Sequence, residues 1–156
     1  TAIGVLAAFQ IHRLILPFGF VIGTVIGSFL TLAAVTLPLT ELMITLSVLF
    51  AGIIVMRGRD VAVLPATILG TLAGLFHGAA YGVAVIGAET TPIIAYLVGF
   101  SLTQLAIMLV AGFAMQKIWK AATIAELQPR LAGALLAGVG VTYLVEHAEQ
   151  FLFSAM

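Results

Sequence analysis

Long apolar runs, separated by short polar stretches, dominate this chain. Five runs reach the length of about 20 residues that a helix needs to cross a bilayer; they cover residues 14–35, 37–56, 61–81, 92–115 and 131–153. A sixth run, residues 1–9, is too short to cross and is predicted to be the final half of a helix. Because the runs lack the period-two alternation of barrel strands, helices are favoured. The pattern predicts a single domain, residues 1–156: an all-α, polytopic transmembrane helix bundle with five full spans plus a partial N-terminal helix.

The composition agrees with a membrane environment. Hydrophobic residues make up 63% of the chain and charged residues 8%, whereas roughly a quarter of the residues in a soluble domain are charged. The lipid bilayer is therefore an expected partner. The net charge is zero and the chain has no basic stripe, which excludes nucleic acid as a partner. The chain has no cysteine, and so it has no disulfide, thiolate metal site or cysteine nucleophile.

The charged residues predict an orientation in the membrane. All the lysines and arginines fall beside connections on one side of the predicted bundle: Arg13, Arg57, Arg59, Lys117, Lys120 and Arg130. The opposite side holds Glu41, Glu89, Glu146 and Glu149. Basic loops stay in the cytoplasm. We therefore expect the basic loops to be cytoplasmic, and residue 1 and the C-terminus to lie outside.

Glycines recur at four-residue spacing on two predicted spans. One set is Gly70, Gly74, Gly78 and Gly82; the other is Gly19, Gly23 and Gly27, and Ala134 with Gly138 makes a weaker pair. Small residues at this spacing allow the backbones of two membrane helices to approach closely. We predict that these glycines serve helix packing.

His77 is the most unusual residue inside a predicted span. Tyr81 lies one turn further on the same helix face, and both flank the second half of the Gly70–Gly82 series. An ionisable side chain inside a membrane segment is costly and indicates a functional site. The alternative is a neutral imidazole that is hydrogen-bonded to a backbone carbonyl or to Tyr81.

Glu89 lies in a segment that is too apolar for an ordinary exposed loop and too broken for a continuous helix. Two interpretations stay open: the segment folds back toward the bundle, or Glu89 caps the helix that begins near Pro92. An imidazole and a carboxylate on the outer side suit a borderline divalent cation such as nickel, cobalt or zinc. We take His77 and Glu89 as the candidate metal-binding residues.

Other polar residues form a second tier of candidates. Glu146, His147 and Glu149 form a cluster at the outer end of the last span, where a solvated helix end is favoured over a cation-gathering role. Gln104, in mid-span, is predicted to make hydrogen bonds between helices and to support the site. Tyr81 belongs to this tier as well.

Several chemistries have no support in the sequence. The chain has no phosphate-binding signature and no G-x-S-x-G motif. Ser28, Ser47 and Ser101 lie in no recognisable nucleophile context. We predict that the protein is not an enzyme.

The runs "FHGAAYG", residues 76–82, and "GAETTPIIAYLVGF", residues 87–100, resemble the second signature of the HupE/UreJ family of small bacterial membrane proteins. This resemblance implies a nickel permease, with cobalt in some branches, and implies that His77 and Glu89 handle the metal. Two departures stand out. Tyr81 replaces a histidine that many members have, and the family's first signature, with His-Pro and Asp-His pairs, is expected just upstream of Thr1. We expect that residues preceding Thr1 belong to the protein.

The resulting prediction is a permease of the bacterial inner membrane that moves Ni²⁺, or Co²⁺, into the cytoplasm for metalloenzymes such as hydrogenase or urease. The metal is cargo, and no permanently bound cofactor is predicted. The alternative is a non-transporting structural or assembly subunit that packs against a larger membrane complex. A homo-oligomer is a further partner arrangement that the sequence leaves open.

Overall fold

The computed structural model describes residues 1–154 and is helical, without strands in that range. Its elements are α1 (Ala2–Ala8), α2 (Ile15–Leu32), α3 (Thr40–Arg57), α4 (Val63–Gly82), the 3-10 turn η1 (Val83–Val85), α5 (Thr90–Phe113), the π-helical turn η2 (Ala114–Ile118) and α6 (Leu127–Ser154). Five of the described helices are long and apolar enough to cross a membrane. The predicted fold class, a helix bundle with five full spans and a partial first helix, is confirmed.

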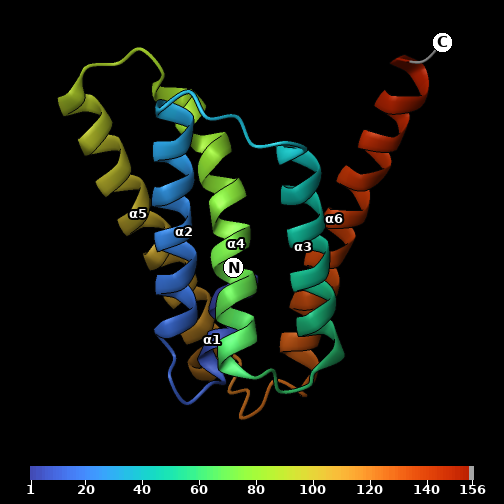
Figure 1. Cartoon of the computed structure of the whole chain (residues 1–156). Coiled ribbons are helices and arrows are strands. Elements are labelled where there is room, and N and C mark those ends of the chain that lie inside the picture. The colour runs from blue at the N-terminus through green and yellow to red at the C-terminus, as the bar shows by residue number, and fades with distance from the viewer. Residues whose placement is uncertain (155–156) are drawn as a thin grey trace.

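Two tightly packed helix pairs form the body of the molecule. Helix α2 packs against α4, and α3 packs against α6. Helix α5 leans against α2 on one flank, while α6 leans outward on the other (Figure 1). Contacts between α3 and α4 join the two pairs. Each main pair consists of helices that are not consecutive in the sequence.

Glycines bring α2 and α4 into backbone contact. A Cβ atom added to Gly27 would overlap the backbone oxygen of Leu75, and one added to Gly78 would overlap the backbone oxygen of Thr24. Hydroxyl groups of α2 reinforce the same interface. Ser28 Oγ donates to the Gly78 carbonyl at 2.9 Å. The two glycine series therefore face each other, and the close approach depends on the absence of side chains there.

Helix α1 is a buried half-helix. It has seven residues, about 10 Å of helix, and it runs from the middle of the bundle to one end (Figure 1). Val5 and Leu6 are buried in a cluster with Leu16, Val55 and Met115. Packing inside the bundle holds this short helix in place. The N-terminus lies part-way along the bundle (Figure 1), and the placement of residue 1 outside the membrane stays a prediction.

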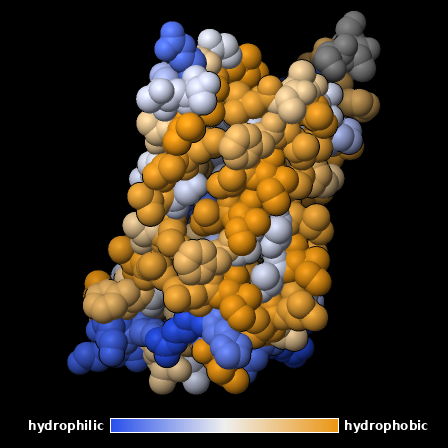
Figure 2. Space-filling view, turned by 60° about the vertical axis from the view of Figure 1, so that its left-hand side comes forward, coloured by the Kyte–Doolittle hydropathy of each residue, from blue (hydrophilic) through white to orange (hydrophobic). Residues whose placement is uncertain are grey.

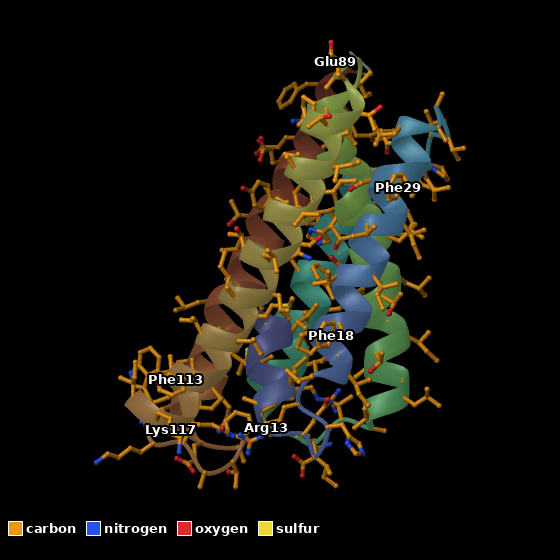
Figure 3. The ribbon with its side chains drawn as sticks, turned by 90° about the vertical axis from the view of Figure 1, so that its left-hand side faces the viewer. Arg13, Phe18, Phe29, Glu89, Phe113 and Lys117 are labelled. Carbon is orange, nitrogen blue, oxygen red and sulfur yellow. The ribbon has the colours of Figure 1, made fainter. Side chains whose placement is uncertain are left out.

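Charge separates the two ends of the molecule. The basic end is formed by the connections 9–14, 58–62 and 119–126, and the acidic end by the connections 33–39 and 83–89 with the end of α6 (Figure 1). Figure 2 shows an apolar belt with a dense hydrophilic band at one end. Arg13 and Lys117 lie at the basic end and Glu89 at the opposite extreme (Figure 3). At the basic end Arg13 donates to Gln116 Oε1 at 2.8 Å, which joins the first connection to η2, the turn that follows α5.

Candidate functional site

His77 lies in the half of α4 that is nearer the acidic end. Helix α4 runs from the basic end to the acidic end and finishes at Gly82. His77 is five residues before that end, about 8 Å along the helix axis. Its side chain is half-buried. The imidazole is therefore inside the apolar belt, one to two turns from the acidic surface.

Both ring nitrogens of His77 have polar neighbours. Nε2 lies 3.0 Å from Ser47 Oγ, which comes from α3. Nδ1 lies 3.4 Å from the hydroxyl of Tyr81, one turn further along α4. The neutral alternative for His77, with Tyr81 as a hydrogen-bond partner, thus matches one of the two contacts. Ser47 is a partner that the sequence did not indicate.

An aromatic wall surrounds this polar group. The ring of Phe20 on α2 lies 5.5 Å from the His77 ring, centroid to centroid. The ring of Tyr81 packs 4.4 Å from that of Phe100 on α5, and Tyr96 stacks on Phe100 at 5.8 Å. These rings come from three helices and keep the imidazole among protein groups. His77 consequently faces the bundle, as its position beside the glycine series predicted.

Glu89 lies apart from this group. It is the exposed N-cap residue of α5, and its side chain makes no capping hydrogen bond. Its backbone oxygen accepts a hydrogen bond from the Ile93 amide at 3.2 Å and so takes part in the first turn of α5. Figure 3 shows the side chain at the extreme acidic end. The segment before it turns at Gly87, with φ +81°, and ends at the helix start without returning Glu89 to the bundle.

The structure does not bring His77 and Glu89 together. In residues 1–154 no hydrogen bond or ring contact joins them, and no group of three or more His, Asp or Glu side chains is arranged to hold a metal ion. Protein ligands from this range would therefore fill only part of a metal's coordination shell. A permanently bound structural metal needs a complete shell, whereas a transported ion must leave again.

The second-tier residues divide between the bundle and its rim. Gln104 Nε2 donates to Thr24 Oγ1 at 3.1 Å and so connects α5 to α2 inside the bundle. Glu146 and Glu149 are exposed near the end of α6, and His147 between them is half-buried. Because α6 leans away from α4 toward this end (Figure 1), these three residues lie on the acidic rim and away from His77.

A separate hollow lies at the basic end. It has a volume of about 320 Å³ and is lined by residues that include Gln10, Asp60 and Ile124. Gln10 Nε2 donates to the Val61 carbonyl at 3.4 Å, while Gln10 Oε1 is buried and has no partner in the part of the chain that the structure describes. This hollow is at the opposite end of the bundle from Glu89.

Sequence reasoning missed the contribution of Ser47. The serine is one of several hydroxyl residues inside spans, and its spacing in the sequence has no feature that distinguishes it from Ser28 or Ser101. A usable signal was the α3–α4 hairpin. Ser47 lies 10 residues before the end of α3 and His77 lies 14 residues after the start of α4, so an antiparallel hairpin places them within about one helical turn of the same height.

Comparison with known proteins identifies a family. The family model described as "HupE / UreJ protein" matches residues 1–143. No curated protein and no solved structure matches the chain. The matched range includes α1 to α5, His77, Glu89 and the larger part of α6.

Proposed function

Because the chain belongs to the HupE/UreJ family, we propose that it is a membrane permease for Ni²⁺, with Co²⁺ as the second candidate cation. The family is of a transporter type and is associated with nickel and cobalt transport for hydrogenase and urease. The five membrane-length helices supply the matching architecture. The observation that supports the proposal most is His77, an imidazole among protein groups inside the apolar belt.

The chemistry of the imidazole selects the class of cation. Imidazole nitrogen binds nickel, cobalt and zinc, whereas magnesium prefers oxygen ligands and retains its water. One imidazole, hydrogen-bonded to the hydroxyls of Ser47 and Tyr81, offers a single nitrogen ligand and would hold such an ion loosely. Water completes the shell during passage. A cargo site of this kind favours exchange over retention.

In this proposal the ion meets Glu89 before it reaches His77. Its exposed carboxylate, together with Glu41, Glu146 and Glu149, makes the acidic end attractive to cations. The ion would first meet this rim and then pass inward to His77. We therefore assign the two metal-handling residues to successive positions along a path. At the basic end of the path, the hollow lined by Gln10 and Asp60 offers side-chain oxygen atoms to the ion.

The orientation follows from the separation of charge. Cytoplasmic loops of membrane proteins are enriched in lysine and arginine, and the basic end holds the connections with Arg13, Arg59 and Lys117. We propose that the basic end faces the cytoplasm and the acidic end faces the periplasm, in the inner membrane of a bacterium. In this orientation the ion enters at Glu89.

Cysteine labelling tests the orientation, because the chain has no native cysteine. We expect Glu149→Cys to react with a membrane-impermeant maleimide in intact spheroplasts, and Lys117→Cys to react only after the membrane is opened. Both residues are exposed, so a difference between them reports sidedness. The opposite labelling pattern would reverse the proposed direction of entry.

Uptake into vesicles that contain only this protein tests the function itself. Vesicles loaded with a nickel-responsive fluorophore should fill with Ni²⁺ faster than protein-free vesicles, and Mg²⁺ in tenfold excess should not compete. A rate equal to that of protein-free vesicles would reject a self-sufficient permease. It would favour the alternative, a structural or assembly subunit. The glycine series gives that alternative little support. Gly27 and Gly78 already pack against the facing helix of the same chain and so are not free to contact another protein.

A further inference from the structure

Ser47 restricts the hydrogen-bonding state of His77. The Ser47 hydroxyl oxygen lies 2.7 Å from the Ile44 carbonyl oxygen and 3.0 Å from His77 Nε2. A serine hydroxyl has one proton to donate. At 2.7 Å, the modal length for an O–H···O bond, the two oxygens would repel each other without a proton between them. The hydroxyl proton therefore belongs to the contact with Ile44.

This assignment fixes the next contact. Ser47 Oγ has no second proton, and so it accepts at the 3.0 Å contact and His77 Nε2 donates. In a neutral imidazole only one nitrogen bears a proton. Nδ1 is then the nitrogen with the free lone pair, and the Tyr81 hydroxyl, 3.4 Å away, donates toward it. The chain of donors runs from Tyr81 through His77 and Ser47 to the Ile44 carbonyl.

The two ends of the imidazole are held unequally. The Ser47 contact, at 3.0 Å, lies within ordinary hydrogen-bond length, whereas the Tyr81 contact, at 3.4 Å, is long and weak. Displacing Tyr81 from Nδ1 therefore costs less than displacing Ser47 from Nε2. Histidines that bind metals use one nitrogen as ligand while the other donates to an acceptor that fixes the tautomer and the ring orientation.

We infer that Ser47 is a positioning residue that holds His77 in the Nε2–H tautomer and so presents Nδ1, behind the Tyr81 hydroxyl, to the transported cation. This inference rests on the proposed function for the identity of the cation. The tautomer itself does not depend on transport. Ser47 touches His77 and acts on the cation through it.

Nitrogen NMR on the complete chain measures this tautomer directly. The chain has three histidines, and replacing His12 and His147 by glutamine leaves His77 as the only ¹⁵N-histidine signal. We expect an unprotonated Nδ1 and a protonated Nε2 in lipid bilayers without metal. Ser47→Ala should abolish this preference and give a mixture of both tautomers, while Ser47→Thr, which keeps the hydroxyl, should retain it.

Two control variants separate Ser47 from its surroundings. Tyr81→Phe should leave the tautomer unchanged, because Tyr81 is the weaker partner, and Ser101→Ala should leave it unchanged as a mid-span serine on α5. A protonated Nδ1 in the parent protein would overturn the inference. So would an unchanged tautomer in Ser47→Ala, or a tautomer that depends on Tyr81 alone.

Adding Zn²⁺, a diamagnetic ion with the same preference for imidazole, tests the second half of the inference. The Nδ1 resonance should shift while Nε2 keeps its proton, and Ser47→Ala should weaken binding by about 10- to 100-fold, the usual effect of removing such a partner. A shift at Nε2 would overturn the assignment of the ligand nitrogen. No shift at either nitrogen, with the expected tautomer in place, would count against the proposed permease and leave the role of Ser47 in the tautomer intact.

Discussion

Nickel uptake falls by at least about 100-fold when His77 is replaced by alanine, if His77 meets the ion within the apolar belt. Removing a partner that only orients a ligand weakens metal binding by about 10- to 100-fold, and removing the ligand itself should cost at least the upper value. Within the described residues, His77 is the histidine that lies inside the apolar belt, where its ring contacts side chains of other helices. Initial rates of radioactive nickel uptake, normalised to the amount of protein in the membrane, measure the loss.

The other histidines provide matched controls. His12 is exposed at the basic end and His147 lies on the acidic rim, and alanine at either position should leave more than half of the uptake rate. His77→Gln preserves a hydrogen-bonding side chain next to Ser47 but lacks the imidazole, and we expect it to be as inactive as His77→Ala. Uptake that persists in both His77 variants would exclude the residue from the path of the ion.

Alanine at Gly27 or Gly78 should lower the free energy of unfolding by about 1–3 kcal/mol, the range seen when extra methyl groups are forced into a packed interior. In both cases the new Cβ would meet a backbone oxygen of the facing helix, which has no alternative rotamer to adopt. Helices α2 and α4 would have to separate, and the Ser28 bond to the Gly78 carbonyl would lengthen. Thermal unfolding in a mild detergent, followed by intrinsic fluorescence, reports the change.

Gly99 and Gly138 serve as controls for these substitutions. An added Cβ at either position meets no atom within 4 Å, and so alanine there should shift the unfolding temperature little. All four sites are glycines within helices. A difference in unfolding temperature between the two pairs of variants therefore reports the packing at each site. Equal effects at Gly27 and Gly99 would mean that the close contact between α2 and α4 is not what stabilises the bundle.

Much of the fold could be read from hydropathy, since the constraint is simple. A backbone in lipid must satisfy its own hydrogen bonds, and each long apolar run therefore becomes a helix. The first run, residues 1–9, was predicted as a partial helix on length alone, and α1 is the result. What hydropathy lacks is any information on which helices are neighbours. The four-residue glycine spacing marked a packing face on α2 and on α4, yet nothing in the sequence said that these two faces meet.

The candidate site was harder to predict for the same reason. His77 and Tyr81 share one helix, and their contact follows from helical spacing. Ser47 and Phe20 reach His77 from other helices, and such contacts depend on how the helices pack in three dimensions. Glu89 illustrates the limit of local pattern, because its segment suited both a fold-back and a helix start. In the structure it begins α5 and stays exposed.

X-ray absorption at the nickel edge tests most directly whether His77 binds the metal. The protein with His12→Gln and His147→Gln retains a single histidine, and nickel bound to it in bilayers should show one imidazole ligand at about 2.0–2.1 Å, a typical metal–nitrogen distance, with oxygen ligands completing the shell. The imidazole signal should vanish when His77→Gln is added. Nickel bound with oxygen ligands alone while His77 is intact would contradict the account.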